Sequence, residues 1–241
     1  MDEPTRSYPP AAGLIQTPAA LVIFDCDGVL IDSEMIFARI LGECLAEADF
    51  AATLEEALSL GFGRNAVTLS AEIERRFGRA LPEGFFPGMR SRTKAAFETE
   101  LRPVAGVVEL LAALQAPRCV ASNSHLDRVR HALALTGLLA YFEPHVFSAS
   151  QVARGKPAPD LFLHAAQRLG VPPGAAIVVE DSVGGVEAAC AAGMTVAGFC
   201  GASHCRDGHA ERLAAAGCSQ VFARMADLAR FLVGTTISGG G

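Results

Sequence analysis

With 241 residues, of which 51% are hydrophobic and 19% charged, the chain is long enough for a packed core and too apolar for an intrinsically disordered protein. Its formal net charge of -6 argues against non-specific binding to nucleic acid, which requires a basic surface. No apolar stretch approaches the roughly 18 residues of a membrane span, so we expect neither nucleic acid nor a membrane as a partner.

The N-terminal segment has neither the basic start nor the apolar centre of a secretory signal, and we expect residues 1–17 to form a flexible arm. Seven cysteines, an odd number without the spacing of a disulfide framework, indicate reduced thiols and a cytoplasmic protein. Five Cys and His residues in the last quarter lack the spacing of paired zinc ligands, and no zinc site is expected there. They are Cys200, His204, Cys205, His209 and Cys218.

The first predicted element is a short strand over 21–24, Leu-Val-Ile-Phe. Branched and aromatic residues without polar alternation are typical of a strand buried on both faces of a parallel sheet. Asp25 and Asp27 follow at its carboxyl end, and Gly28 then permits a sharp turn. Aspartates are common where strands end, but a strand buried on both faces has no structural use for two adjacent carboxylates. Because ligands of open α/β sheets bind at this end of the strands, the pair is a candidate site.

The next part of the chain, up to residue 101, contains no predicted strand. Its apolar spacing predicts helices over 33–48, 53–60, 64–77 and 88–100, separated by glycines and prolines. A helical block that interrupts a β-rich chain predicts an inserted domain.

From residue 102 onwards, predicted helices and strands alternate, which implies right-handed crossovers and a parallel sheet. Strands are predicted over 118–121, 145–147, 176–179, 195–197 and 220–222. Helices are predicted over 107–114, 126–136, 159–169, 183–192, 211–216 and 225–232, and 238–241 is a loose tail. We therefore predict an α/β fold, with a Rossmann-like parallel core (18–33 plus 102–234) and an inserted all-helical domain (34–101).

Polar residues follow two further predicted strands. Ser122 and Asn123 come after 118–121, before a helix, and are equally typical of a phosphate cradle and of a helix cap. Glu180 and Asp181 come after 176–179, where a helix N-terminus favours acids. Two buried strands that each end in paired acids would repel one another by about 4 kcal/mol for each pair at 4 Å and an effective dielectric of 20, unless a cation lay between them. Hard oxygen ligands beside a phosphate favour Mg²⁺.

The stretch 24–34, Phe-Asp-Cys-Asp-Gly-Val-Leu-Ile-Asp-Ser-Glu, resembles the first motif of the haloacid dehalogenase (HAD) superfamily. It is most similar to the members with a small helical cap, the β-phosphoglucomutases and sugar-phosphate phosphatases. The Gly-Lys-Pro-x-Pro-Asp pattern at 155–160 and the acidic pair at 180–181 resemble later motifs of the same family. The resemblance covers about 20–232 and implies that 34–101 is the cap.

The resemblance also implies a role for each motif residue. Asp25 would be the nucleophile and would form an aspartyl-phosphate, while Asp27 would act as acid and base and give its backbone carbonyl to the metal. Lys156 would pair with the nucleophile and the phosphate. Two phosphate-binding residues and two further metal ligands complete the implied site: Ser122, with Asn123 as its neighbour, and Asp181, with Glu180 bound directly or through water.

The substrate is the least constrained part of the prediction. Cap loops select it in the family, and the matching segment 60–65 contains Arg64, a candidate for holding a second anionic group. The β-phosphoglucomutases carry a histidine where this chain has Phe37, which counts against a mutase. We expect a magnesium-dependent phosphatase that acts on a small phosphorylated metabolite, either a sugar phosphate or a sugar-acid phosphate. The alternatives are a β-phosphoglucomutase-type mutase and an inactive HAD domain that serves as a binding module.

Overall fold

The computed structural model describes residues 19–64 and 66–236, and six parallel strands form a single sheet within them. The strands are β1 (Leu21–Phe24), β2 (Arg118–Ser122), β3 (Val146–Ser148), β4 (Ala176–Glu180), β5 (Thr195–Phe199) and β6 (Gln220–Phe222). Their order is β3-β2-β1-β4-β5-β6, which is the Rossmann order. The predicted α/β fold with a Rossmann-like core is confirmed, and β1 lies at its centre between β2 and β4.

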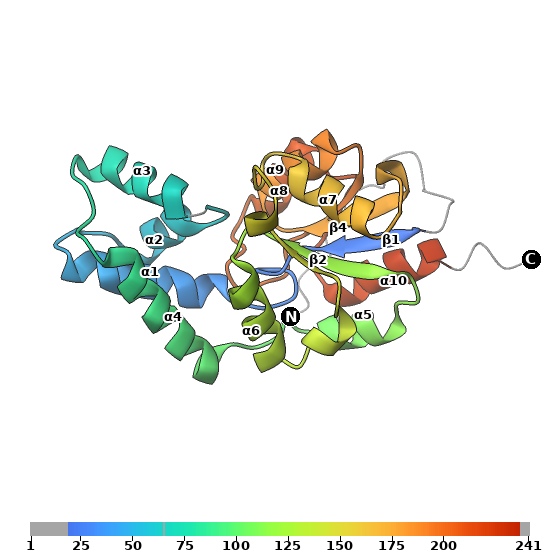
Figure 1. Ribbon diagram of the computed structural model, residues 1–241, viewed down its shortest axis with the longest axis horizontal. Helices are drawn as coiled ribbons and strands as arrows, with labels where there is room; N and C mark the ends of the chain where they lie inside the picture. The colour runs from blue at the N-terminus through green and yellow to red at the C-terminus, as the bar shows by residue number, and fades with distance from the viewer. Residues whose placement is uncertain (1–18, 65, 237–241) are drawn as a thin grey trace, which may run out of the picture.

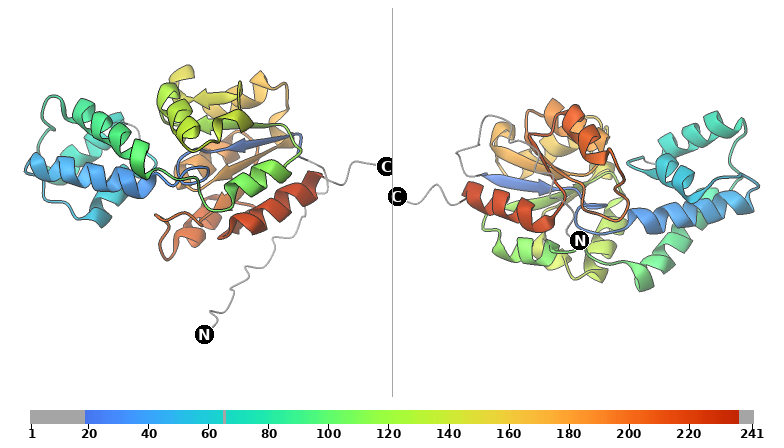
Figure 2. Two further views of the ribbon diagram at one scale, coloured as in Figure 1. Left: turned by 90° about the horizontal axis from the view of Figure 1, so that it is seen from below. Right: turned by 180° about the vertical axis from the view of Figure 1, so that it is seen from behind.

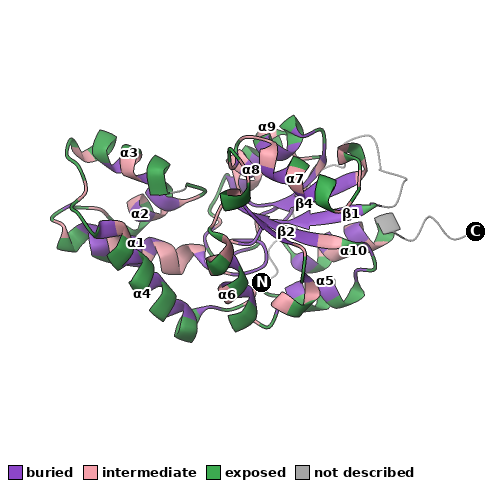
Figure 3. Ribbon diagram, in the orientation of Figure 1, coloured by how far each residue is buried: buried purple, intermediate pink, exposed green. Residues whose placement is uncertain are grey.

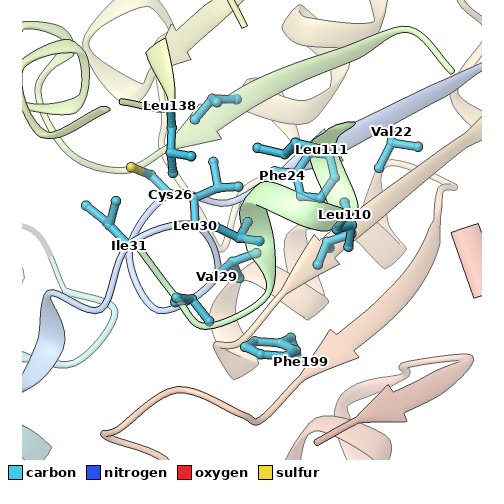
Figure 4. Close-up of a cluster of buried hydrophobic side chains, with 14 of the residues drawn as sticks. Val22, Phe24, Cys26, Val29, Leu30, Ile31, Leu110, Leu111, Leu138 and Phe199 are labelled. Carbon is cyan, nitrogen blue, oxygen red and sulfur yellow. The ribbon is translucent and has the colours of Figure 1, made fainter. Parts of the chain in front are cut away.

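Successive residues of the strands point to opposite faces of the sheet, and each face carries its own hydrophobic cluster. Val22 and Phe24 belong to the cluster under α5 (Val107–Ala113), α6 (Leu126–Leu135) and α10 (Met225–Thr236). Figure 4 shows part of this cluster, where Val22 and Phe24 lie beside Leu110 and Leu111 of α5.

Leu21 and Ile23 belong to the cluster on the opposite face. That face is covered by α7 (Asp160–Arg168), α8 (Val183–Ala191) and α9 (His209–Ala216). The two helix layers enclose the strands (Figure 1), and every residue of β1 and β4 is buried (Figure 3).

The helices α1 (Glu34–Glu47), α2 (Leu54–Gly61), α3 (Ala66–Phe77) and α4 (Phe85–Glu100) lie together beyond the carboxyl ends of the strands (Figures 1 and 2). They share a hydrophobic cluster, which includes Leu41, Phe50, Leu69 and Ile73 and contains no strand residue. The apolar faces of these helices therefore pack mainly on one another.

The chain passes between the sheet and α1–α4 twice, and the two crossings lie side by side. Asp32 N donates to the carbonyl of Arg102 at 3.0 Å, and Val104 N donates to the carbonyl of Leu30 at 2.9 Å. Ile31 and Pro103 also form an isolated antiparallel bridge. This short pairing joins the two parts of the molecule at the edge nearest the end of β1.

Three predicted helix starts are wrong. Helix α9 begins at His209 instead of residue 211. Helix α4 begins at Phe85 instead of residue 88, because Pro87 falls in the first turn, where a missing N–H leaves no hydrogen bond unmade. Helix α3 begins at Ala66 instead of residue 64, because Arg64 ends the preceding loop by donating to carbonyls of α2. The predicted arm 1–17 and tail 238–241 lie outside the described residues. Within 19–64 and 66–236, no helix has both the length and the apolar character that a membrane crossing needs.

Candidate active site

Asp25 lies directly after β1, at the centre of the sheet edge where the strands end. Phe24 is in register with Val179 of β4, and the Asp25 N–H donates to the Val179 carbonyl at 2.9 Å. On its two sides, β2 ends at Ser122 and β4 ends at Glu180. The strand order thus brings together three of the polar strand ends that the sequence singled out.

Lys156 connects these acids. Its Nζ lies 2.8 Å from Asp25 Oδ1 and 2.5 Å from Glu180 Oε1, and its side chain is only 5% exposed. Burial by itself would lower the pKa of Lys156, but the two carboxylates raise it, so the ammonium stays charged. Burial raises the pKa of Asp25 well above its ordinary value, Lys156 opposes this effect, and Glu180 and Asp181 add to it.

The two acids after β4 are held differently. Glu180 is completely buried, and its Oε2 accepts from Asp181 N, Ser182 N and Ser182 Oγ at 3.0–3.1 Å. Gly185 lies against this carboxylate, because a Cβ there would fall 1.9 Å from Glu180 Oε1. Asp181 is also buried, but its Oδ2 accepts no hydrogen bond from the described residues. Asp181 is therefore the acid of this pair that has a carboxylate oxygen left for a ligand.

The side chains of Ser122 and Asn123 make different hydrogen bonds. The Ser122 hydroxyl is 2% exposed and accepts from Ser124 N at 3.1 Å. The Asn123 side chain pairs with the backbone of Lys156: its Nδ2 donates to the Lys156 carbonyl at 3.1 Å, and its Oδ1 accepts from Lys156 N at 2.8 Å. Asn123 therefore positions the loop that carries the lysine, a role that the sequence prediction of a phosphate ligand did not include.

The Asp27 carboxylate is paired with Arg128, which lies 101 residues further along the chain. Arg128 Nη1 and Nη2 donate to its two oxygens, each at 2.9 Å. Burial by itself would raise the pKa of Asp27, but Arg128, Ser33 and Ser124 lower it below its ordinary value. Sequence reasoning missed Arg128, since the helical pattern of α6 gives no sign of a distant partner.

A cavity of about 820 Å³ lies between these strand ends and helices α1–α4. Its sheet side includes Asp25, Asp27, Ser122, Asn123, Lys156, Glu180 and Asp181, all of the sequence-predicted residues of the core. Its helical side includes Arg64, Arg90 and Lys94. Arg64 lines the cavity as expected, although its Nη1 donates to Ser59 O and Leu60 O at 2.6 and 2.9 Å. Arg90 and Lys94, one turn apart on α4, were not singled out from the sequence.

A family model described as haloacid dehalogenase-like hydrolase matches residues 19–193. The chain belongs to this hydrolase family. The 6-phosphogluconate phosphatase of Escherichia coli strain K12 is 33% identical over 184 residues, which cover 76% of this chain and 83% of that protein. The haloacid dehalogenase-like protein described here is therefore an enzyme with phosphatases among its relatives.

Solved structures of the family have the same fold over most of their length. A conserved haloacid dehalogenase-like protein of Agrobacterium tumefaciens strain C58 has a TM-score of 0.78 and 40% identity, covering 87% of this chain and 95% of that one. A HAD family hydrolase of Deinococcus radiodurans R1, solved with bound phosphate and sodium, has a TM-score of 0.76 and 33% identity, covering 91% and 97%.

The acidic residues of this haloacid dehalogenase-like enzyme fit a magnesium ion. Asp25, Glu180 and Asp181 bring carboxylate oxygens within 4.8 Å of one another, although like charges at this separation repel. Asp181 Oδ2 is buried and accepts no well-aligned hydrogen bond from the described residues, although His204 Nε2 lies 3.0 Å away, so this oxygen is available to bind a cation. The three candidate metal ligands are all carboxylates, with no sulfur or imidazole among them, which suits Mg²⁺.

His204 lies in the loop after β5 and is buried. Its Nε2 is 3.0 Å from Asp181 Oδ2, and its ring centroid is 4.8 Å from that of Phe62 in the loop after α2. His209 Nε2 lies 2.7 Å from the Asp181 carbonyl oxygen. The position of His204 just after a strand end was the signal that could have found this link, since β5 lies beside β4 in the sheet.

Residues of this loop and of α9 bear on the expectation that no zinc binds here. Three of the five residues in question, His204, Cys205 and His209, bring ligand atoms within 4.8 Å of one another. Both ring nitrogens of His209 are already engaged, by the Asp181 carbonyl and by Arg212. Burial also raises the pKa of the Cys205 thiol to about 12, which disfavours the thiolate. That no zinc binds here stays a prediction.

Magnesium should stabilise the protein more at high pH than at low pH. Asp25 and Asp181 both have raised pKa values in the folded chain, so the folded state holds protons that the unfolded chain releases, and stability without metal falls as pH rises through the folded pKa values. Mg²⁺ competes with these protons. At 100 times its dissociation constant it should add about 2.7 kcal/mol, or roughly 5–10 °C in Tm, at about pH 8.

Thermal unfolding with and without MgCl₂, at about pH 8 and about pH 5.5, measures this difference. The gain in Tm should shrink markedly at the lower pH. Asp181→Asn should remove most of the gain at the higher pH, whereas Asp207→Asn, which changes an exposed acid outside the cavity, should keep it. An equal gain at both pH values, or a full gain in Asp181→Asn, would contradict the assignment of the metal site.

Proposed function

We propose that the enzyme is a magnesium-dependent phosphomonoesterase that acts on a small phosphorylated sugar or sugar acid through an aspartyl-phosphate on Asp25. The observation that carries the proposal is the buried contact of Lys156 with Asp25 and Glu180, at adjacent strand ends, facing a cavity. A buried ammonium among acids makes an otherwise repulsive position tolerable for a phosphate dianion. In this proposal, helices α1–α4 (34–101) are the cap over the core formed by 18–33 and 102–234.

In the first half-reaction, an Asp25 carboxylate oxygen attacks phosphorus and the bond to the leaving oxygen breaks. Lys156 holds the attacking carboxylate and one phosphate oxygen, and the Ser122 hydroxyl donates to another. Asp27 gives a proton to the leaving alkoxide. Mg²⁺, held by Asp25, Asp181 and the Asp27 carbonyl, would supply positive charge that offsets the repulsion between carboxylate and phosphate.

In the second half-reaction, water attacks the phosphorus of the aspartyl-phosphate. Asp27 takes one proton from this water, and Asp25 leaves as a free carboxylate. The proton gained by Asp27 replaces the one that it gave to the alkoxide, so the cycle balances as ester plus water to alcohol plus phosphate. The lowered pKa of Asp27 favours its ionised form, which accepts this proton, and opposes the protonated form that the first half-reaction uses; the proton taken from water regenerates that form.

Glu180 is proposed to act mainly through Lys156. Both of its oxygens are engaged, Oε1 by Lys156 and Oε2 by Asp181 N and by Ser182. A direct bond to the metal would require some of these contacts to break. We therefore assign the direct metal contact to Asp181 and a water-mediated one to Glu180.

A phosphatase is favoured over a mutase by Phe37. Its ring lines the cavity and lies against Gly61, where a Cβ would be 2.6 Å from Phe37 Cε1. A hydrocarbon ring at this place has no proton to exchange, in contrast to the histidine of the mutases that the sequence resembles. An inactive binding module is disfavoured because a buried lysine held between acids is typical of catalytic sites.

The helical side of the cavity supports a substrate with a second negative charge. Arg90 and Lys94 lie one turn apart on α4, opposite the strand ends, and Arg64 lies on the loop after α2. Two cations one helical turn apart suit a carboxylate, and the related Escherichia coli enzyme is a 6-phosphogluconate phosphatase. A sugar-acid phosphate is therefore the substrate class that these residues fit best.

Phosphate release from 6-phosphogluconate and from a neutral sugar phosphate, with and without Mg²⁺, tests the proposal. We expect magnesium-dependent release from both, and Lys94→Met with Arg90→Met should lower kcat/KM for 6-phosphogluconate by about 10-fold or more while changing the neutral substrate little. Arg75→Met, which removes an exposed arginine of α3 outside the cavity, is the matched control. Isomerisation that needs a bisphosphate and releases no phosphate would instead identify a mutase, and no turnover of any phosphate ester would indicate a binding module.

A further inference from the structure

The Asp27 carboxylate is held by four hydrogen-bond donors. Arg128 Nη1 and Nη2 donate to Oδ2 and Oδ1 at 2.9 Å each, Ser33 Oγ donates to Oδ1 at 2.6 Å, and Ser124 Oγ donates to Oδ2 at 3.1 Å. The planar guanidinium fork fixes the plane of the carboxylate, which single-point donors such as the two serines do not. The direction in which Asp27 presents its oxygens therefore depends chiefly on Arg128.

Arg128 is itself fixed from both parts of the molecule. It belongs to α6 of the core, and its Nη1 also donates to Ser124 Oγ at the start of that helix. Its guanidinium carbon lies 5.1 Å from the ring centroid of Phe97, a buried residue in the last turn of α4. The Asp27 carboxylate is thereby connected to α4 through one arginine and one aromatic ring.

We propose that Arg128 is a positioning residue for the reaction, which fixes the orientation of the Asp27 carboxylate and ties this orientation to helix α4 through Phe97. The inference rests on the proposed function, in which Asp27 moves protons. We assign Arg128 to Asp27 rather than to the phosphate, because both of its terminal nitrogens donate to that carboxylate and Nη1 donates to Ser124 Oγ as well.

Proton transfer by a positioned group contributes about 10²- to 10⁴-fold to rate, and misplacement by about 1 Å can lose about 10²-fold. The loss should depend on the leaving group. An alkoxide needs a proton as it departs, whereas 4-nitrophenolate is stable without one. A positioning role thus predicts a selective effect on alkyl phosphates, whereas a role in folding or in phosphate binding affects both substrates alike.

The experiment measures kcat/KM for 4-nitrophenyl phosphate and for a neutral sugar phosphate, in wild type and in Arg128→Met, Asp27→Ala and the double variant. Arg128→Met should lower the value for the sugar phosphate by about 10- to 100-fold and the value for the aryl phosphate by less than about 3-fold. Added to Asp27→Ala, it should cause no further loss. Arg128→Lys keeps the positive charge but loses the two-pronged guanidinium. Its kcat/KM for the sugar phosphate should therefore be closer to that of Arg128→Met than to that of wild type.

Arg130→Met is the matched control, because Arg130 lies on the same helix, pairs with Glu143 and does not line the cavity. This substitution should change kcat/KM for neither substrate. Melting temperatures of all variants identify any that fail to fold. If Arg128→Met fails to fold, Arg128→Lys still provides the test.

Three results would overturn the proposal. They are an equal loss of kcat/KM for both substrates that persists in the Asp27→Ala background, a wild-type kcat/KM in Arg128→Lys, or a raised kcat/KM for the sugar phosphate in Arg128→Met. The first indicates a structural or phosphate-binding role, the second a role for charge alone, and the third an arginine that holds Asp27 out of the reaction. Failure of the proposed function has a different signature, because Asp27→Ala would then leave the ratio of the two substrates as in wild type.

Discussion

Asp25→Asn should abolish phosphate release, with a loss on the order of 10⁴-fold or more in kcat, while leaving the protein folded. An amide does not displace a leaving group from phosphorus, so the first half-reaction has no nucleophile. The substitution should leave the fold intact, because Lys156 keeps Glu180 as its buried partner and the neutral amide relieves the repulsion of Asp25 with Glu180 and Asp181. Phosphate release under saturating Mg²⁺, together with the melting temperature, measures both effects.

Asp207→Asn is the control for this variant, since it makes the same change at an exposed position that does not line the cavity. It should keep wild-type activity and stability. Residual activity above about a tenth in Asp25→Asn would remove Asp25 from the nucleophilic role. Loss of activity together with a large drop in melting temperature would instead indicate that the carboxylate supports the fold.

Lys156→Met should lose both activity and stability. Its ammonium is the buried partner of Asp25 and Glu180, and removing one partner of a buried ion pair destabilises by about 3–5 kcal/mol. Loss of a charge aimed at the phosphate should lower kcat by about 10³-fold. The destabilisation should be smaller at low pH, because Asp25, whose pKa Lys156 no longer lowers, then takes up a proton and is no longer an unpaired buried charge. Urea unfolding at two pH values and a turnover assay measure these effects.

The structure offers two tests of this explanation. Lys156→Met combined with Glu180→Gln should recover much of the lost stability and none of the activity, since the double variant no longer buries an unpaired Glu180 charge. Lys94→Met, which removes the chain's only other lysine at an exposed position, should leave stability unchanged. If Lys156→Met were as stable as wild type at neutral pH, the buried ion pairs would not have the energetic role assigned to them.

The strand ends were predictable from the sequence because their signal is local. Leu21–Phe24 and Ala176–Glu180 are short apolar runs that end in acids, and parallel strands bring such ends to one edge of a sheet. The pairing of β1 with β2 and β4 then places Asp25 between Ser122 and Glu180. The helical block was predictable for a similar reason, since its periodicity contains no competing strand pattern.

The partners of these residues were not predictable, because they come from distant segments. Arg128 meets Asp27 across 101 residues, and Asn123 meets the Lys156 backbone across 33. His204 meets Asp181 because β5 pairs with β4, and its position just after a strand end was the one local sign of this contact. In each case the sequence shows a polar residue on a helix or loop, where a solvated side chain is the ordinary expectation.

Glu34 is a further residue that the structure adds to the site. It lies in the first turn of α1 and lines the cavity, and burial together with Asp27 and Asp181 raises the pKa of its carboxyl to about 8. An acid in the first turn is expected from the helix dipole alone, so its sequence position did not indicate that it would line the cavity.

The most direct measurement for the central claim uses Asp27→Ala with 4-nitrophenyl phosphate in a rapid-quench experiment. This substrate needs little help from an acid, whereas attack of water on the intermediate lacks its base, so phosphoryl-enzyme should accumulate. We predict a burst of about one nitrophenolate per enzyme molecule and, after acid quench and peptide mass mapping, a phosphoryl group on Asp25. Release of nitrophenolate and phosphate at equal rates without a burst, or a phosphoryl group on any other residue, would contradict the account.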